Sequence, residues 1–405
     1  MSDSRFSVEG GLPFGRALLA HFPLEPGGVY LNHGTVGVTP LAVMRARAAI
    51  LDEIERHPAR YMIRELMQLG MSAPPAAPRL RAAAARVAAF LGVQRDDLVF
   101  VDNASSGINA VLRAVELEPG DEILISDQAY GGVVRAAAFI AHGGGAALAS
   151  FALPFPATDP AACVRAVEQA ITSRTRLAVL DHVSSETALV LPLAAMAAAC
   201  RARGVPVLVD GAQALGAIGV DIAGLGVDWY AANLHKWCFV PRSCGVLWAA
   251  PERHAGLHPG VISWGITSDD WLQEFEWTGT RDPSPWLAAP AGLDFMHEVL
   301  GVAAMRDHNH RLAWHGAGHL SARWGQAWTT PESMVGCMVT LPLPARLGPA
   351  DPATAQRLRD ALLFGHGIEA PVIARGGALW IRLSLQVYND ESDIDRLENA
   401  VAALR

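Results

Sequence analysis

The sequence predicts an α/β protein with a mostly parallel central sheet, helices on both faces of it, and a smaller C-terminal α+β domain. Between about residues 97 and 250, short apolar runs such as DLVFV and DEILIS alternate with helical patterns such as NASSGINAVLRAV. Strands that are apolar on both faces and separated by helices are typical of a covered parallel sheet. The ligand site of such a sheet lies at the carboxyl ends of its strands.

Seven apolar runs are expected to form the sheet. In chain order they are residues 97–101, 121–126, 146–153, 176–183, 205–210, 227–233 and 244–249. Helical patterns follow the first four runs. Polar clusters follow several of the strands, so we expect them to meet at one edge of the sheet.

The length of 405 residues is large for a single core, which favours a large domain carrying a smaller one. Residues 1–28 look like an irregular arm, residues 29–285 are expected to form the large domain, and residues 286–405 the small domain. In the small domain we expect strands at 334–343, 368–373 and 379–386, with helices after about 305, around 351–367 and from 391.

Composition excludes several kinds of partner. The net charge is −8 and lysine is almost absent, whereas nucleic acids and anionic membranes select clustered basic residues. No apolar run is long enough to span a bilayer, and the opening MSDSRFSVEGG lacks the pattern of a secretion signal, so a cytoplasmic location is expected. The five cysteines form no C-x-x-C pair, which indicates neither a disulfide framework nor a metal site.

Lysine occurs once, at position 236, although lysine and arginine together number 32. Arginine cannot form an imine, so a position that needs a nucleophilic amine is one where arginine fails. Lys236 follows the apolar run VDWYAAN, close to Asn233 and His235. A solvated surface lysine is the alternative. At a strand end, however, partial burial would lower the pKa of the amine and allow it to form a Schiff base.

Asp210 ends the run VLVD, and Gln213 follows three residues later. Taken alone, Asp210 is most simply a helix cap. Beside a Schiff-base lysine, a carboxylate can instead pair with the ring nitrogen of a pyridoxal cofactor and keep it protonated. Gln213 is then a candidate partner of the phenolic oxygen.

Ser105 and Ser106 lie with Asn103 in a polar turn between a strand and a helix. Capping of that helix is the simplest role for the turn. The same geometry directs free N–H groups and the helix dipole at an anion, so it can also hold a phosphate.

Two further clusters, SDQAYGG and LDHVSSET, follow other strands. Tyr130 offers an aromatic face for a flat cofactor, and ordinary core packing is an equal alternative. His182, Ser184 and Ser185 are candidates for the polar edge of the ring, or for purely structural roles.

The ordered motifs NASSGIN, SDQAYGG, DHVSSETALVLP, VDGAQALG, NLHKW and FEWTGTRDPSPWLAAP resemble those of class V aminotransferase-fold enzymes, specifically the isopenicillin N epimerase-like branch. YLNHGTVGVTP near the start and WIRLSLQVYNDESDIDRL near the end also fit, so the resemblance runs from about residue 29 to the end. It implies pyridoxal phosphate as cofactor, the fold type I architecture, and a homodimer with active sites at the subunit interface.

The resemblance also implies individual roles. Lys236 would form the aldimine, Asp210 would contact the pyridine nitrogen, and Gln213 would contact the phenolic oxygen. The residues around the phosphate would be Ser105, Ser106, Asn233, His235 and, from the neighbouring subunit, Thr280. Arg382 would clamp the substrate carboxylate, for which a bidentate guanidinium is suited, and Asn32 and His33 would face the substrate.

The implied function is chemistry at the α-carbon of a small or specialised amino acid, with epimerase or lyase chemistry ranked first by family analogy. Transamination and ring-forming chemistry are alternatives. Desulfurases of this fold carry a cysteine on the loop before the carboxylate-binding arginine, and the corresponding stretch LLFGHGIEAPVIARGGALWIRLS has none. Desulfurase activity by that route is therefore disfavoured.

Two other classes of protein fit less well. A binding protein that had lost the chemistry would be expected to lack Lys236, Asp210 or Arg382, and all three are present. A nucleotide-binding doubly wound protein needs a glycine-rich first turn, which VDNASSGIN lacks.

Overall fold

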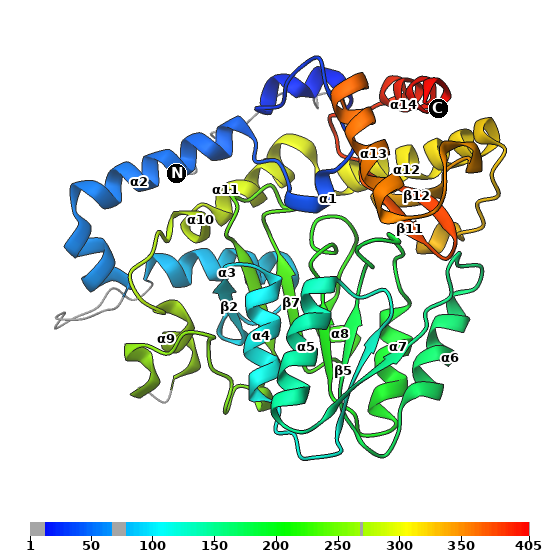
Figure 1. Ribbon diagram of the computed structural model, residues 1–405. Helices are drawn as coiled ribbons and strands as arrows, with labels where there is room; N and C mark the ends of the chain where they lie inside the picture. The colour runs from blue at the N-terminus through cyan, green and yellow to red at the C-terminus, as the bar shows by residue number, and fades with distance from the viewer. Residues whose placement is uncertain (1–12, 67–77, 268–269, 405) are drawn as a thin grey trace.

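The computed structural model describes residues 13–66, 78–267 and 270–404, and its centre is a seven-stranded sheet (Figure 1). The strand order is β2-β8-β7-β6-β5-β3-β4, and only β8 runs antiparallel to its neighbours. The strands are β2 (Leu98–Val101), β3 (Glu122–Ser126), β4 (Ala147–Phe151), β5 (Thr175–Asp181), β6 (Val207–Asp210), β7 (Trp229–Asn233) and β8 (Gly245–Ala249). The mostly parallel sheet expected from the sequence is confirmed.

Successive side chains of each strand enter two cores on opposite faces of the sheet. On β6, Val207 and Val209 join one core, whereas Leu208 joins the other. The first face is covered by α3 (Arg79–Leu91), α6 (Pro160–Ala170) and α7 (Leu193–Arg201), and the second by α4 (Ala104–Ala114) and α5 (Gly131–Gly143). Burial of both faces explains why these strands are almost wholly apolar.

The C-terminal α+β domain is also confirmed. Its antiparallel sheet has the order β11-β12-β9. The strands are β9 (Met338–Pro342), β11 (Val372–Arg375) and β12 (Ala378–Ser384), and the helices that share their core are α12 (Val302–Trp324), α13 (Pro352–Asp360) and α14 (Glu391–Ala403).

The first strand of the chain packs with this C-terminal domain. β1 (Val29–Tyr30) pairs in parallel with β10 (Ile368–Glu369), and Leu31 is buried in the C-terminal core. The expected strand at 368–373 is therefore divided, because β10 pairs with β1 while β11 pairs with β12. The expected arm at 1–28 contains a 3₁₀ helix, Arg16–His21, and its residues 1–12 lie outside the described part of the chain.

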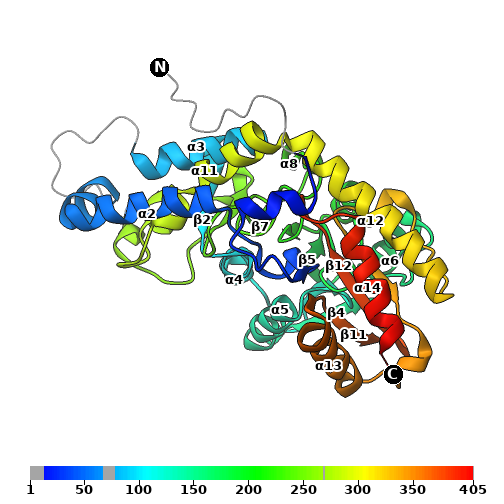
Figure 2. The same ribbon diagram turned by 90° about the horizontal axis from the view of Figure 1, so that it is seen from above.

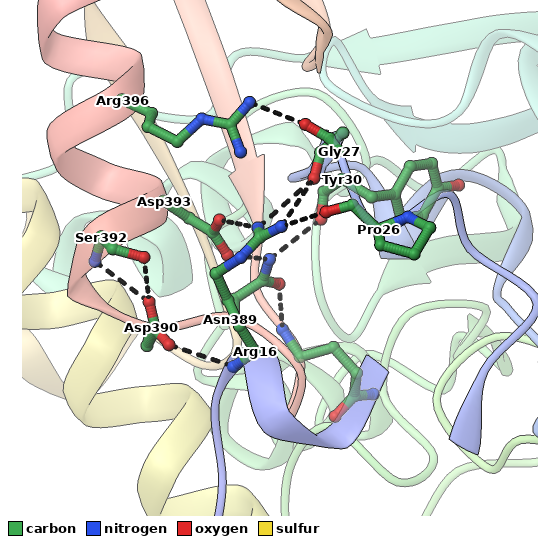
Figure 3. A network of polar contacts seen from close by, with 11 residues as sticks. Arg16, Pro26, Gly27, Tyr30, Asn389, Asp390, Ser392, Asp393 and Arg396 are labelled. Carbon is green, nitrogen blue, oxygen red and sulfur yellow. Dashed lines mark hydrogen bonds and ion pairs between the residues drawn. The ribbon is translucent and has the colours of Figure 1, made fainter. Parts of the chain in front are cut away.

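Arg16 fixes the described part of the arm to the C-terminal domain, as Figure 3 shows. Its guanidinium contacts the fully buried carboxylate of Asp393 at 2.6 Å, and its backbone N–H donates to Asp390 Oδ2 at 3.0 Å. Asn389 continues the network by donating to Asp393 Oδ2 at 2.9 Å and to the Tyr30 carbonyl at 3.2 Å. A buried carboxylate requires such partners, so the arm is part of the structure of this domain.

Further helices frame the large domain. They are α1 (His33–Val36), α2 (Leu41–Arg56), α8 (Ile222–Leu225), α9 (Trp271–Glu276), α10 (Ser284–Leu287) and α11 (Ala289–Asp294), with π-helical turns at Arg60–Leu66 and Phe295–Leu300. A third π-helical turn, Ala361–Gly365, packs in the C-terminal core. Both views show α2 extending to the side away from α13 and α14 (Figure 1 and Figure 2). Among the described residues, no helix is both long and apolar enough to cross a membrane.

The loop that follows α1 packs directly on the turn after β7. Gly37 has a φ of +70°, and a Cβ built there would lie 1.9 Å from the His235 carbonyl oxygen and 2.9 Å from the Lys236 Cα. Only glycine allows this approach, because any side chain would collide with backbone that cannot move aside.

We therefore expect Gly37→Ala to destabilise the protein well beyond the roughly 1–2 kcal/mol that a left-handed conformation costs an L-residue. The control for the cost of a positive φ alone is Gly92→Ala, because Gly92 is left-handed, with a φ of +67° and a ψ of 28°, but has no neighbour within 4 Å of its Cβ position. Denaturant unfolding of both variants measures the difference. Equal losses of stability would contradict the close packing at Gly37.

Candidate active site

A cavity of about 290 Å³ lies at the carboxyl ends of β2, β5, β6 and β7. The residues that line it are Thr35, Asn103, Ala104, Ser105, Tyr130, Asp181, Val183, Ser185, Asp210, Ala212, Gln213, Asn233, His235 and Lys236. The strand-end location expected from the sequence is therefore where the polar residues gather.

Lys236 contributes the only primary amine of any side chain in this protein, and this half-buried residue lines the cavity. Burial lowers the pKa of Lys236 to about 8, the nearby Asp210 carboxylate acts to raise it, and Arg382 acts to lower it further. Loss of solvation disfavours the charged form, so a substantial fraction of the amine is neutral near pH 8. A neutral amine is both a nucleophile and a base.

Asp210 ends β6, and its carboxylate is also buried. Burial raises the pKa of Asp210, while the hydrogen bond from the Ala212 N–H, 3.0 Å to Oδ1, and the charge of Lys236 both lower it. The carboxylate therefore faces Lys236 across the cavity as its electrostatic partner.

Asp181 is a second buried acid at this edge, and nothing in the sequence marks it beyond its position at a strand end. It ends β5 in register with Asp210, and its Oδ2 accepts from the Ser126 hydroxyl at 3.2 Å. Burial, together with the charge of Asp210, raises the pKa of Asp181 well above its usual range. Two neighbouring carboxylates cannot both ionise cheaply, so Asp181 is the one that retains its proton.

The start of α4 forms one end of the cavity. Asn103 caps the helix by accepting from the Ser106 N–H at 3.0 Å, and Asn233 Oδ1 accepts from the Ala104 N–H at 2.8 Å. Within the described chain, the Ser105 N–H has no protein acceptor, and Ser105 lines the cavity. Ser106 instead lines an adjoining cavity of about 300 Å³.

His235 and Gln213 line the cavity with part of their bonding capacity already used. His235 Nδ1 lies 2.8 Å from the Cys244 carbonyl oxygen and must donate to it, which leaves Nε2 available. Burial lowers the pKa of His235 to about 4. Gln213 donates to the Gly34 carbonyl at 2.7 Å and accepts from the Trp237 indole at 2.9 Å.

Two aromatic candidates behave differently. Tyr130 lines the cavity, and its side chain is about half exposed, at 51%. His182 does not line the cavity: its Nδ1 lies 2.8 Å from the buried Tyr230 hydroxyl, and burial lowers its pKa to about 4.

Arg382, on β12, is buried behind the cavity and forms no ion pair with a carboxylate among the described residues. It donates to the Ser185 carbonyl at 2.6 Å, to Thr35 Oγ1 at 2.7 Å and to Asn32 Oδ1 at 3.0 Å, and Nε has no hydrogen bond. Ser185 and Thr35 are cavity residues. Burial lowers the pKa of Arg382 to about 10, with Glu186 acting to raise it.

Three of the expected residues lie away from the cavity wall. Asn32 contacts Arg382 and donates to Glu369 Oε1 at 2.9 Å. His33 is fully buried beneath Lys236. Thr280 lines a separate cavity of about 420 Å³ together with Asp102 and Arg281.

The sequence model of the family described as "Aminotransferase class-V" matches residues 29–397. Isopenicillin N epimerase from Streptomyces clavuligerus is 33% identical over 94% of this chain and 96% of its own. A probable chloroplastic L-cysteine desulfhydrase from Arabidopsis thaliana is 28% identical over 94% and 83%, and hercynylcysteine sulfoxide lyase from Schizosaccharomyces pombe is 25% identical over 94% and 95%.

Solved structures share the fold. A C-DES mutant with glycine covalently linked to its PLP cofactor has a TM-score of 0.77 at 23% identity, covering 96% of this chain and 99% of that one. The cysteine desulfurase CsdA from Escherichia coli has a TM-score of 0.75 at 22% identity, covering 96% and 98%. By the extent of the family match and the identity to the epimerases, this chain belongs to the class V aminotransferase family and is a pyridoxal-phosphate-dependent enzyme of fold type I.

Proposed function

We propose that this enzyme removes the α-hydrogen of a small or specialised amino acid and completes an epimerisation or a lyase reaction. The observation that carries the proposal is that two unusual basic side chains lie at one cavity. Lys236 lines the cavity with a partly neutral amine, and the buried Arg382 guanidinium donates to two lining residues and forms no ion pair with a carboxylate of the described chain. An unpaired buried charge is costly, which points to an anionic ligand for Arg382.

Two features of this structure support binding of pyridoxal phosphate by the cavity residues. The Ser105 N–H at the start of α4 and Nε2 of His235 are free to meet the phosphate. His235 can donate through Nε2 only after it takes up a proton, which a bound dianion favours. Asp210 would hold the ring nitrogen, and Lys236 would hold the aldehyde carbon.

Each residue then has a chemical task. When bound, pyridoxal phosphate draws electrons from the α-carbon of the amino acid. Asp210 would favour a proton on the ring nitrogen, because an ionised carboxylate beside it stabilises the charged ring. Lys236 would accept the α-proton at Nζ, for which a pKa of about 8 is well matched.

Arg382 would recognise the substrate's α-carboxylate. Its partners Asn32, Thr35 and Ser185 are neutral and fix the plane of the guanidinium without cancelling its charge. Because Nη2 donates to both Asn32 and Thr35, a carboxylate would bind in a bidentate way by taking over one of these hydrogen bonds. Asn32 would therefore act by orienting Arg382.

The fate of the α-carbon is the finer part of the proposal. The relatives at 25–33% identity include epimerases, desulfhydrases and a sulfoxide lyase, which supports epimerase or lyase chemistry over transamination or ring formation. A persulfide route has little support, because all five cysteines are buried. Burial raises the pKa of Cys337 to about 12, far from a reactive thiolate.

We also propose a homodimer. Val261, Ile262 and Trp264 form an apolar stretch before α9 with exposed fractions of 60%, 55% and 77%. Such a stretch supports burial against another chain. Thr280 follows this stretch in the sequence and would reach the phosphate of the neighbouring subunit.

The first test uses Lys236→Ala and Lys236→Arg. Exchange of the substrate α-hydrogen with deuterated solvent, followed by NMR over a panel of amino acids, should fall by about 10²- to 10⁴-fold in both variants, because neither supplies a base of suitable pKa. Chiral chromatography and assay of released keto acid then separate epimerisation from elimination. If exchange persists in both variants, Lys236 is not the base.

The second test measures the pKa of Lys236 in cofactor-free protein, through ¹³Cε labelling of the single lysine. The pKa should be about 8 in the wild type and lower in Asp210→Asn, because the charge of Asp210 acts to raise it. Asp159→Asn is the control, since Asp159 is an exposed cap of α6 and an amide can also cap. An unchanged or increased pKa in Asp210→Asn would remove Asp210 from the site.

The third test concerns Arg382→Ala. Losing a desolvated charged pair costs roughly 2–5 kcal/mol, so kcat/KM should fall by about 10²-fold or more while cofactor binding remains. A substrate analogue with a neutral amide in place of the carboxylate should lose much less. The control is Arg375→Ala, on the neighbouring strand, where Arg375 pairs with Asp127 at 3.1 Å. Equal losses for the acid and the amide would make Arg382 structural.

A further inference from the structure

The backbone carbonyl of Lys236 is held from below by a buried histidine. His33 Nε2 lies 2.8 Å from the Lys236 carbonyl oxygen, and His33 Nδ1 lies 2.9 Å from the Tyr388 hydroxyl. Both His33 and Tyr388 are buried, and the rings of Trp237 and Phe239 lie 5.0 and 5.8 Å from the His33 ring. These aromatic neighbours leave His33 little freedom to rotate.

The chemistry of these contacts fixes the tautomer of His33. A carbonyl oxygen can only accept, so Nε2 carries the hydrogen and Nδ1 accepts from the Tyr388 hydroxyl. Burial lowers the pKa of His33 to about 4, which keeps the ring neutral. The Gln386 amide nitrogen, 3.3 Å from Nε2, is itself a donor, because its Oε1 already accepts from Asn309 at 2.8 Å. The Lys236 carbonyl therefore decides which nitrogen of His33 carries the hydrogen, and the Tyr388 hydroxyl donates to the nitrogen that remains.

The turn that carries Lys236 needs such support. Phe239, three residues after Lys236, has a φ of +58°, a conformation that a bulky residue adopts only when its surroundings impose it. On the other side of the turn, Gly37 packs against the His235 carbonyl and the Lys236 Cα. Contacts from outside the turn therefore fix the backbone of Lys236, and with it the point from which the side chain reaches the cavity.

Tyr388 belongs to the C-terminal domain and is itself anchored. It follows β12, and its ring packs edge-on against Phe22 of the arm at 4.9 Å. Its neighbour Asn389 joins the network of Arg16 and Asp393 in Figure 3. The Tyr388 hydroxyl and the His33 imidazole thus link this domain to the backbone of Lys236.

We propose that His33 and Tyr388 are positioning residues for Lys236: Tyr388 holds the His33 ring by donating to Nδ1, and His33 holds the lysine turn by donating to its carbonyl. The inference rests on the proposed role of Lys236 and reassigns His33 from the substrate to the lysine backbone.

The test is Tyr388→Phe in the full-length holoenzyme, which removes one hydroxyl and keeps the aromatic packing. We expect kcat for α-hydrogen exchange to fall about tenfold with KM nearly unchanged, since loss of one hydrogen bond of about 1–1.5 kcal/mol corresponds to that factor. The pH titration of the bound cofactor's absorbance should shift, and the ¹³Cε resonance of Lys236 should move or broaden. Tyr61→Phe is the control, because the Tyr61 hydroxyl bonds to Glu53 and Arg79 far from the site.

A second pair of variants keeps the proposal falsifiable if Tyr388→Phe is poorly folded. His33→Gln retains an N–H donor for the Lys236 carbonyl and should recover part of kcat and of the absorbance titration, whereas His33→Leu should not. If Tyr388→Phe matches Tyr61→Phe in the titration, the resonance and kcat, or if His33→Gln and His33→Leu behave alike, the positioning role is wrong. Absence of α-hydrogen exchange in the wild type would instead refute the proposed function, while the lysine resonance would still report on positioning.

Discussion

The Lys236 amine lies at the edge of the central sheet, with the Asp210 carboxylate and the Arg382 guanidinium both close enough to influence its pKa. Removing these charges from water costs free energy, and the surrounding opposite charges and hydrogen bonds offset that cost. The parallel strands bring Asp210 and Lys236 to one edge, and α4 directs a free N–H at the same space. The pKa of the amine follows from this balance of burial and opposing charges.

Residues of both domains contribute to this site, although they lie far apart in the sequence. Arg382 comes from the C-terminal sheet and reaches Thr35 and Ser185, which line the cavity of the large domain. The carbonyl of Lys236 is held by His33, whose other nitrogen is held by Tyr388. The proposed substrate recognition and the proposed positioning of the base therefore depend on the same domain contact, and a movement of the C-terminal domain would affect both.

Sequence patterns predicted most of the secondary structure because strands buried on both faces must be apolar, as in β6 and β7. Sequence patterns predicted the strands less well where a strand pairs with a segment that is distant in the sequence. β10 and β11 form one apolar stretch in the sequence, but they join different sheets because β1 returns to pair with β10. The sequence does not distinguish Asp181 from other acids at strand ends, because only the strand register places it beside Asp210. Likewise, only the structure shows that the His182 ring contacts the Tyr230 hydroxyl and does not line the cavity.

By itself, the sequence determined the fold class and the family motifs, and it made Lys236 the candidate amine, since a single lysine among so many arginines is expected where an amine is needed. Only the tertiary structure decided what each polar residue faces. It placed His33 under the lysine turn, bonded Arg382 to neutral partners, and turned Ser106 and Thr280 toward other cavities. The reason is physical: residue type and spacing fix what a side chain can do, but its partners and its solvation depend on segments hundreds of residues away.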